Sequence, residues 1–106
     1  MPKYLLEVEY TLQGAKALLE KGGSARKAAA QAAVKSVGGK VEAFYFAFGG
    51  TDAYVVMDAP DNQAAAAVAL TVSAGGGATV RTVVLLTPDD IDQASTQKVK
   101  YSPPGG

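Results

Sequence analysis

The sequence predicts an α+β fold in which a four-stranded antiparallel sheet carries helices on one face. Strand-like and helix-like segments follow one another in the order β-α-β-β-α-β, and glycine or proline separates most of them. The segment 40–48 (KVEAFYFAF) has apolar residues on both faces of a strand. The helical stretches can cover only one face of such a sheet. We therefore expect the other face to need a second subunit or a ligand.

The first third of the chain is predicted to form one strand and two helices. Residues 3–10 alternate as a strand, and residues 12–20 form a short helix that glycines 22 and 23 end. A second helix follows over 25–37, with Ser24 as its N-cap, because a serine hydroxyl can accept hydrogen bonds from free backbone N–H groups. The side chains that this helix is expected to bury are Ala29, Ala33, Val34 and Val37.

The middle of the chain is predicted to form a β-hairpin. Gly38 and Gly39 end the second helix, because glycine enters the left-handed conformation at little cost. In the strand over 40–48, the alternation of side chains predicts one shared face for Glu42, Phe44, Phe46 and Phe48. A turn over 49–52, with glycine at positive φ, leads into a strand over 53–57.

The last third is predicted to form a helix, a strand, a short helix and a tail. Asp61 is the expected N-cap of the third helix, and residues 79–86 form the fourth strand. Thr87, Pro88 and Asp90 have the spacing of a capped helix start, which predicts a helix over 88–97. Residues 99–106 are an extended tail. The whole chain, 1–106, is one domain with the element order of a ferredoxin-like fold plus one C-terminal helix.

Composition excludes several classes of function. Ten Lys and Arg balance ten Asp and Glu, so no net charge attracts nucleic acid or an acidic membrane. Cysteine and histidine are both absent, which excludes thiolate and imidazole catalysis and the usual zinc and haem ligands. We therefore expect no metal and no cofactor. The chain shows no transmembrane stretch and no signal-peptide core at its start, and a cytoplasmic location is expected.

The uncovered sheet face predicts self-association. Depending on register, this face is expected to carry Leu5, the three phenylalanines of segment 40–48, and valines of the later strands. Soluble monomers rarely expose so many apolar side chains together. A homodimer or higher homo-oligomer would cover them, since a two-fold axis lets one patch serve both subunits. The alternative is a monomer whose tail or last helix folds across the open face.

Two groups of residues are candidate sites. The aromatic stripe Phe44, Phe46 and Phe48 could bind a small molecule, with Asp52, Glu7 and Glu42 nearby as carboxylates. The structural alternative is that the stripe forms core or interface and that Asp52 bonds to turn backbone. Separately, the start of the second helix could hold an anion through Gly23, Ser24 and Arg26. Its alternative is a helix break with solvated basic side chains.

The sequence resembles the GYD-domain family. The resemblance lies in the stretches PKYLLEVEYT, QGAKALLEKGGSARKAA, GGKVEAFYFAFG, GGTDAYVV, LLTPDDIDQA and YSPPG. Gly49 or Gly50 and Asp52 match the family pattern, whereas Thr51 stands where a tyrosine is expected. The resemblance implies a subunit of the dimeric α+β barrel kind. It implies no established activity or catalytic residues.

Three functions remain open from the sequence. The leading expectation is an oligomeric barrel that binds a small apolar or aromatic ligand. The second is a cofactor-independent monooxygenase or isomerase, in which Asp52, Glu7 or Glu42 would act as the base. The third is a structural association module.

Overall fold

The computed structural model, in which residues 1–105 are described, confirms the predicted α+β class. Four antiparallel strands form one sheet in the order β2-β3-β1-β4, which is the ferredoxin-like arrangement. The elements in chain order are β1 (Lys3–Tyr10), α1 (Leu12–Lys21), α2 (Gly23–Ser36), β2 (Lys40–Phe46), β3 (Ala53–Asp58), α3 (Asn62–Ala74), β4 (Ala78–Leu85) and α4 (Pro88–Ser95).

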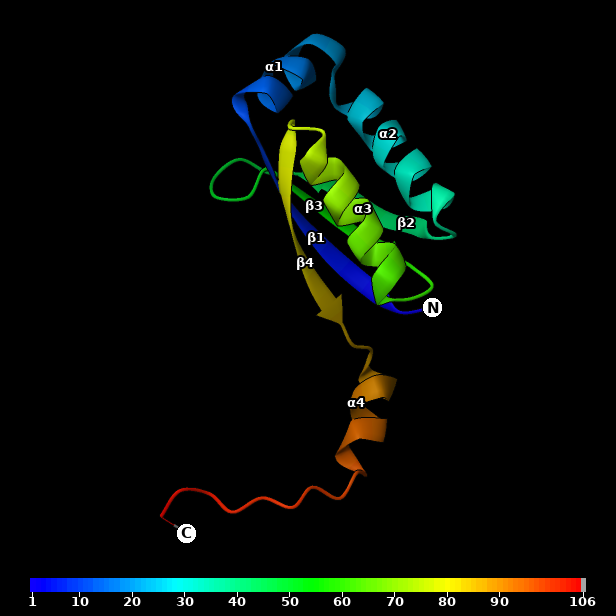
Figure 1. Ribbon diagram of the computed structural model, residues 1–106, viewed down its shortest axis with the longest axis vertical. Helices are drawn as coiled ribbons and strands as arrows, with labels where there is room; N and C mark the ends of the chain where they lie inside the picture. The colour runs from blue at the N-terminus through cyan, green and yellow to red at the C-terminus, as the bar shows by residue number, and fades with distance from the viewer. Residues whose placement is uncertain (106) are drawn as a thin grey trace.

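Two helices cover one face of the sheet. Helix α2 packs on β2 and α3 packs on β4, and both lie on the same side of the sheet (Figure 1). Helix α1 lies at one end of the sheet and joins α2 through Gly22, whose φ of 86° favours glycine. No helix within residues 1–105 covers the opposite face, which we call the open face.

The core lies between the sheet and these helices. Its largest fully buried side chains are Tyr4 of β1, Met57 and Val55 of β3, and Val34 of α2. The Tyr4 hydroxyl donates a hydrogen bond of 2.6 Å to Oδ1 of Asn62, so the one polar atom of this ring has a partner. Because side chains alternate along a strand, Leu5 and Val56 lie on the open face.

A β-bulge changes which side chains of β2 share a face of the sheet. The pairing of β2 with β3 shifts register between Val41 and Ala43. Phe44 and Phe46 therefore lie on the helix-covered face, where Phe44 packs against the core. Glu42 lies instead on the open face, where it accepts a hydrogen bond from Lys3. The prediction that Glu42, Phe44 and Phe46 share one face is wrong, because a strict alternation cannot include a bulge. The prediction that the uncovered face carries the three phenylalanines is also wrong, since Phe44 and Phe46 lie on the covered face and Phe48 lies beyond the end of β2.

Three local predictions, two helix caps and one glycine conformation, are confirmed. Asp61 caps α3 by accepting from the Ala64 N–H, and Thr87 forms a capping box with Asp90, as predicted. Gly38 has the expected positive φ of 83°.

Three other local predictions are wrong. Ser24 does not cap α2, since Gly22 occupies the N-cap position and no side chain bonds there. Gly49 and Gly50 do not have positive φ values. Phe48 lies beyond the end of β2 and is fully exposed.

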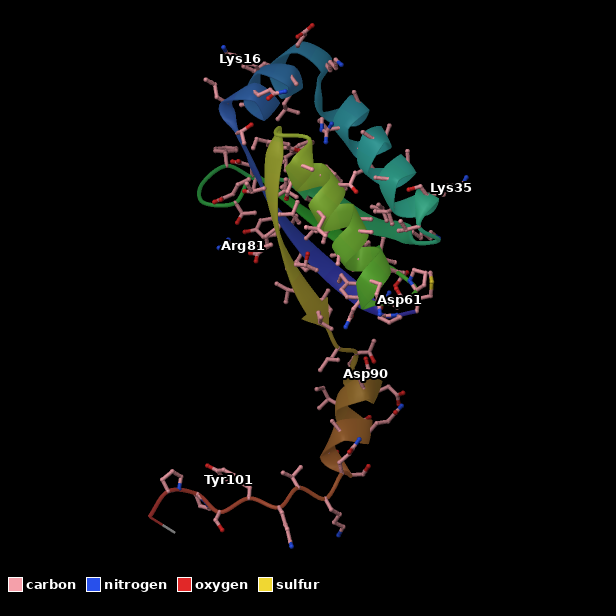
Figure 2. All side chains as sticks on the ribbon, viewed as in Figure 1. Lys16, Lys35, Asp61, Arg81, Asp90 and Tyr101 are labelled. Atoms are coloured by element: carbon pink, nitrogen blue, oxygen red, sulfur yellow. The ribbon has the colours of Figure 1, made fainter. Side chains whose placement is uncertain are left out.

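Residues 86–105 form a C-terminal arm that extends away from the sheet and helices. Helix α4 buries none of its residues, and Tyr101 lies far out on the arm (Figures 1 and 2). The alternative in which this segment folds across the open face is therefore not observed. Within residues 1–105 no helix combines the length and the apolar character needed to cross a membrane.

Candidate ligand-binding cleft

A cavity of about 70 Å³ lies between α2, α3 and the sheet. Phe44 of β2 and Val55 of β3 belong to its floor, and Val68 of α3 belongs to one wall. The opposite wall is α2, which presents small side chains there, chiefly Ala30 and Ala33. Since alanine fills little volume, α2 and α3 pack on the sheet without closing the space between them.

A second cavity of about 250 Å³ lies towards α1 and shares lining residues with the first. The two have Tyr10, Arg26 and Val72 in common, and we call them together the helix–sheet cleft. One end of the second cavity forms where Gly14 of α1 meets Gly77. A β-carbon at Gly14 would overlap the Gly77 carbonyl oxygen, so only glycine permits this approach.

Arg26 is the only charged residue that lines the cleft among the residues described. Its Nε is buried and makes no hydrogen bond to any of the residues that the structure describes. The basic side chains of Lys16 and Lys35, in contrast, project away from the body of the protein (Figure 2). Other polar side chains that line the larger cavity are those of Tyr10, Gln13 and Thr71. A partly buried cation whose Nε donor is unused, among mainly apolar walls, is suited to an organic ligand with a negative group.

Four of the sequence-predicted residues meet in a different place. Phe46, Phe48, Asp52 and Gly23 line an open depression of about 400 Å³ beside α1. The Gly23 position allows the Phe46 ring to approach α2, because a β-carbon there would lie 2.8 Å from Cε2 of Phe46. Tyr10 lines both this depression and the cleft.

Asp52 holds the hairpin against β1. Its Oδ2 accepts a 2.8 Å hydrogen bond from the Tyr10 N–H, and its own N–H donates to the Val8 carbonyl oxygen at 2.9 Å. The predicted structural role as an acceptor from backbone N–H groups is therefore observed, although the partner lies on β1 and not in the turn. Thr51, at the position where a tyrosine is expected, is buried.

Glu7 and Glu42 lie on the open face, away from Phe44 and Phe46. Lys3 Nζ pairs with Glu42 at 2.7 Å and with Asp58 at 2.9 Å, whereas Arg81 lies 4.0 Å from Glu7. Hydrogen bonds to Glu42 and then to Asp58 raise the pKa of the Lys3 ammonium, because both carboxylates favour its charged form. These carboxylates are engaged in surface ion pairs and do not line the cleft.

The structure thus divides the predicted site residues among three locations. The cleft contains Phe44 and Arg26, the depression contains Phe46, Phe48, Asp52 and Gly23, and the open face contains Glu7 and Glu42. Ser24 is exposed and belongs to none of them. Sequence reasoning missed Tyr10 and Val72, which both cavities of the cleft share. The signal for Tyr10 was available, since it continues the buried face of β1 at the end of that strand.

Comparison with known proteins places the chain in a family. No curated protein and no solved structure matches it. The family model described as the GYD domain matches residues 4–95, which include all of the described strands and helices except Lys3, the first residue of β1. The match covers most of the chain, and this protein therefore belongs to the GYD domain family.

Proposed function

We propose that this protein binds a small, largely apolar or aromatic molecule in the helix–sheet cleft and that it acts as a homo-oligomer. The observation that carries the ligand proposal is the cleft itself. Protein interiors are normally packed without voids much larger than a water molecule, yet here alanines face an apolar space above Phe44. The larger cavity, about 250 Å³, approaches the lower end of the usual range for ligand pockets, about 300–1,000 Å³.

The enzymatic alternative receives less support. Asp52, one of the three candidate bases, accepts a hydrogen bond from the Tyr10 N–H and lines the open depression, not the helix–sheet cleft. Glu7 and Glu42 lie on the opposite face of the sheet from Phe44. A general base must reach the proton that it removes. None of these carboxylates lines the cleft in which we propose that a small apolar molecule binds.

The open face supports self-association through an apolar band with charged borders. Strand register aligns Ala43, Val56, Leu5 and Val83 across all four strands, and we call this row the open-face band. One neighbouring row contains Lys40, Asp58, Lys3 and Leu85, and the other contains Tyr45, Tyr54, Glu7 and Arg81. A two-fold axis along the band would place the row with Lys3 over the row with Glu7 of a second copy. Opposite charges would then meet around a shared apolar centre.

The C-terminal arm is a second reason to propose a second copy. The family match runs to residue 95, at the end of α4, yet α4 buries none of its residues in the single chain. Ile91, Val99 and Tyr101 are all more than half exposed on this arm. Burying apolar side chains of this size stabilises a complex by about 1.5–3 kcal/mol each. We propose that the arm packs on the neighbouring subunit.

Filling the cleft tests the ligand proposal. Ala33→Leu places a larger side chain in the cleft, and Ala32→Leu makes the same change at an exposed position of the same helix. N-phenyl-1-naphthylamine, a neutral aromatic probe, reports binding by its fluorescence. We expect the wild type and Ala32→Leu to bind the probe, and Ala33→Leu to bind it at least about tenfold more weakly, because the added methylenes occupy its space. Equal binding by the two variants would refute the assignment to the cleft.

A further inference from the structure

We propose that the ligand of the helix–sheet cleft carries one carboxylate, and that Arg26 binds this group while the apolar body lies over Phe44. This inference rests on the proposed function, since it names the chemical class of the molecule bound there. It makes Arg26 the residue that determines specificity for acids over neutral molecules of the same shape.

The first argument is the unused donor. The Nε of Arg26 is buried and makes no hydrogen bond to any residue within 1–105, although buried polar groups in proteins are almost always paired. No Asp or Glu is among the described residues that line either cavity, and none of the ion pairs in residues 1–105 includes Arg26. The partly buried guanidinium therefore has one buried donor that no described residue uses, and no carboxylate lines the cleft beside it.

The second argument is the position of Arg26 at the junction of the two cavities. On one side lie the apolar side chains of Phe44, Val34 and Val68, and on the other lie Gln13 and Thr71. A ligand with an apolar body and one polar end would match this division. A guanidinium binds a carboxylate through two parallel hydrogen bonds, which fixes orientation as well as charge.

The third argument concerns the number of charges. Arg26 is the single charged residue lining the cleft within the described part of the chain. A phosphate ester would bring up to two negative charges into an apolar space with one cation. A monocarboxylate balances the charge of the site, whereas a dianion leaves one negative charge without a cation among the described residues that line the cleft. The acid is therefore aromatic or aliphatic and carries one negative group.

The test compares probes of equal shape and different charge. Isothermal titration calorimetry measures 2-naphthoate against 2-naphthamide, and octanoate against octanamide, on the full chain. We expect at least one acid to bind the wild type about tenfold or more tightly than its amide, because only the acid supplies the counter-charge. Arg26→Met should remove this preference, lowering the affinity for the acid about tenfold while leaving the amide within about twofold.

Lys27→Met is the matched control. It removes the same charge from the next residue of α2, which is exposed and does not line the cleft. We expect it to keep the preference for the acid within about twofold, since a solvated charge contributes little. Circular dichroism establishes that each variant folds. If Arg26→Met does not fold, the wild-type comparison of acid with amide still decides the question.

The outcomes separate this inference from the proposed function. Equal binding of acid and amide by the wild type would refute the role of Arg26 and leave ligand binding in place. A preference for the acid that Arg26→Met retains, or that Lys27→Met removes equally, would also refute that role. If neither acids nor amides bind and N-phenyl-1-naphthylamine gives no signal, the proposed function itself fails.

Discussion

The two faces of the sheet differ in how completely side chains of the same chain cover them. On the helix-covered face, Tyr4, Val55 and Met57 are at most 2% exposed, and they have partners within the same chain. On the open face, Val83 is 39% exposed within a row bordered by ion pairs. The covered face therefore stabilises the single chain. The open face has charged borders, and the apolar band between them is partly exposed in the single chain.

Adjacent valines of β3 give the sharpest test of this difference. Val55 lies on the covered face and is buried, whereas Val56 lies in the open-face band and is half-buried. We expect Val55→Ala to lower the free energy of unfolding by about 2–3 kcal/mol, through lost burial and a larger cavity. Val56→Ala should cost about 1 kcal/mol or less in the single chain. Urea denaturation measures both.

The stability costs of the same two substitutions can be compared at several protein concentrations. If a second copy covers the open face, the cost of Val56→Ala should grow with protein concentration, because association stabilises the folded state. The cost of Val55→Ala should not change. Equal costs at every concentration would contradict the distinction between the two faces.

A charge in the open-face band should prevent association. Val83→Lys places an ammonium in the band, and Val84→Lys makes the same change at the next residue, which is exposed on the other face. We expect the wild type to sediment as a dimer or larger at micromolar concentration. Val83→Lys should weaken association by about tenfold or more, because burying an unpaired charge is unfavourable. Sedimentation velocity provides the measurement.

Val84→Lys serves as the control and should associate like the wild type. Deleting residues 87–106 should also weaken association while leaving the unfolding of the single chain unchanged, since no residue of α4 is buried in that chain. A monomeric wild type would refute the proposal of self-association. Equal effects of Val83→Lys and Val84→Lys would refute the assignment to the open face.

The smallest predicted effect is a change in Tm that comes from the charged border of the open face. The raised pKa of Lys3 means that its ion pairs with Glu42 and Asp58 stabilise the protein while Lys3 is protonated. That contribution is complete below the unfolded value, about 10.4, and is lost as the pH rises through the higher folded value. Lys3→Met should therefore lower Tm slightly at pH 8, and the difference from the wild type should shrink above about pH 10.4.

Lys40→Met controls for the loss of charge alone. Lys40 lies in the same row as Lys3 but takes part in none of the ion pairs observed in residues 1–105. Its Tm difference from the wild type should not follow the same pH dependence. A Lys3→Met difference that is constant from pH 8 to strongly alkaline conditions would contradict the role of the ion pairs.

Prediction from the sequence succeeded where neighbouring residues carry the signal. Asp61 and Thr87 were identified as caps because a cap depends on N–H groups only a few residues away. The same reasoning failed at Ser24, where Gly22 begins α2 without a side-chain cap. Among the candidate site residues, Arg26 was named as an anion site for its place near a helix start. The feature that now supports it, a buried Nε beside a cavity, depends on α2 lying over the sheet.

The sequence by itself determined the α+β class, the order of the elements and the family, because alternation, helical periodicity and capping are local properties of the chain. Only the tertiary structure decided which face Phe44 occupies, since the bulge between Val41 and Ala43 exists through pairing with β3. It also decided that Arg26 lines a cleft and that α4 stands apart from the sheet. Burial depends on how segments that are far apart in the sequence pack together, and no local sequence pattern specifies that packing.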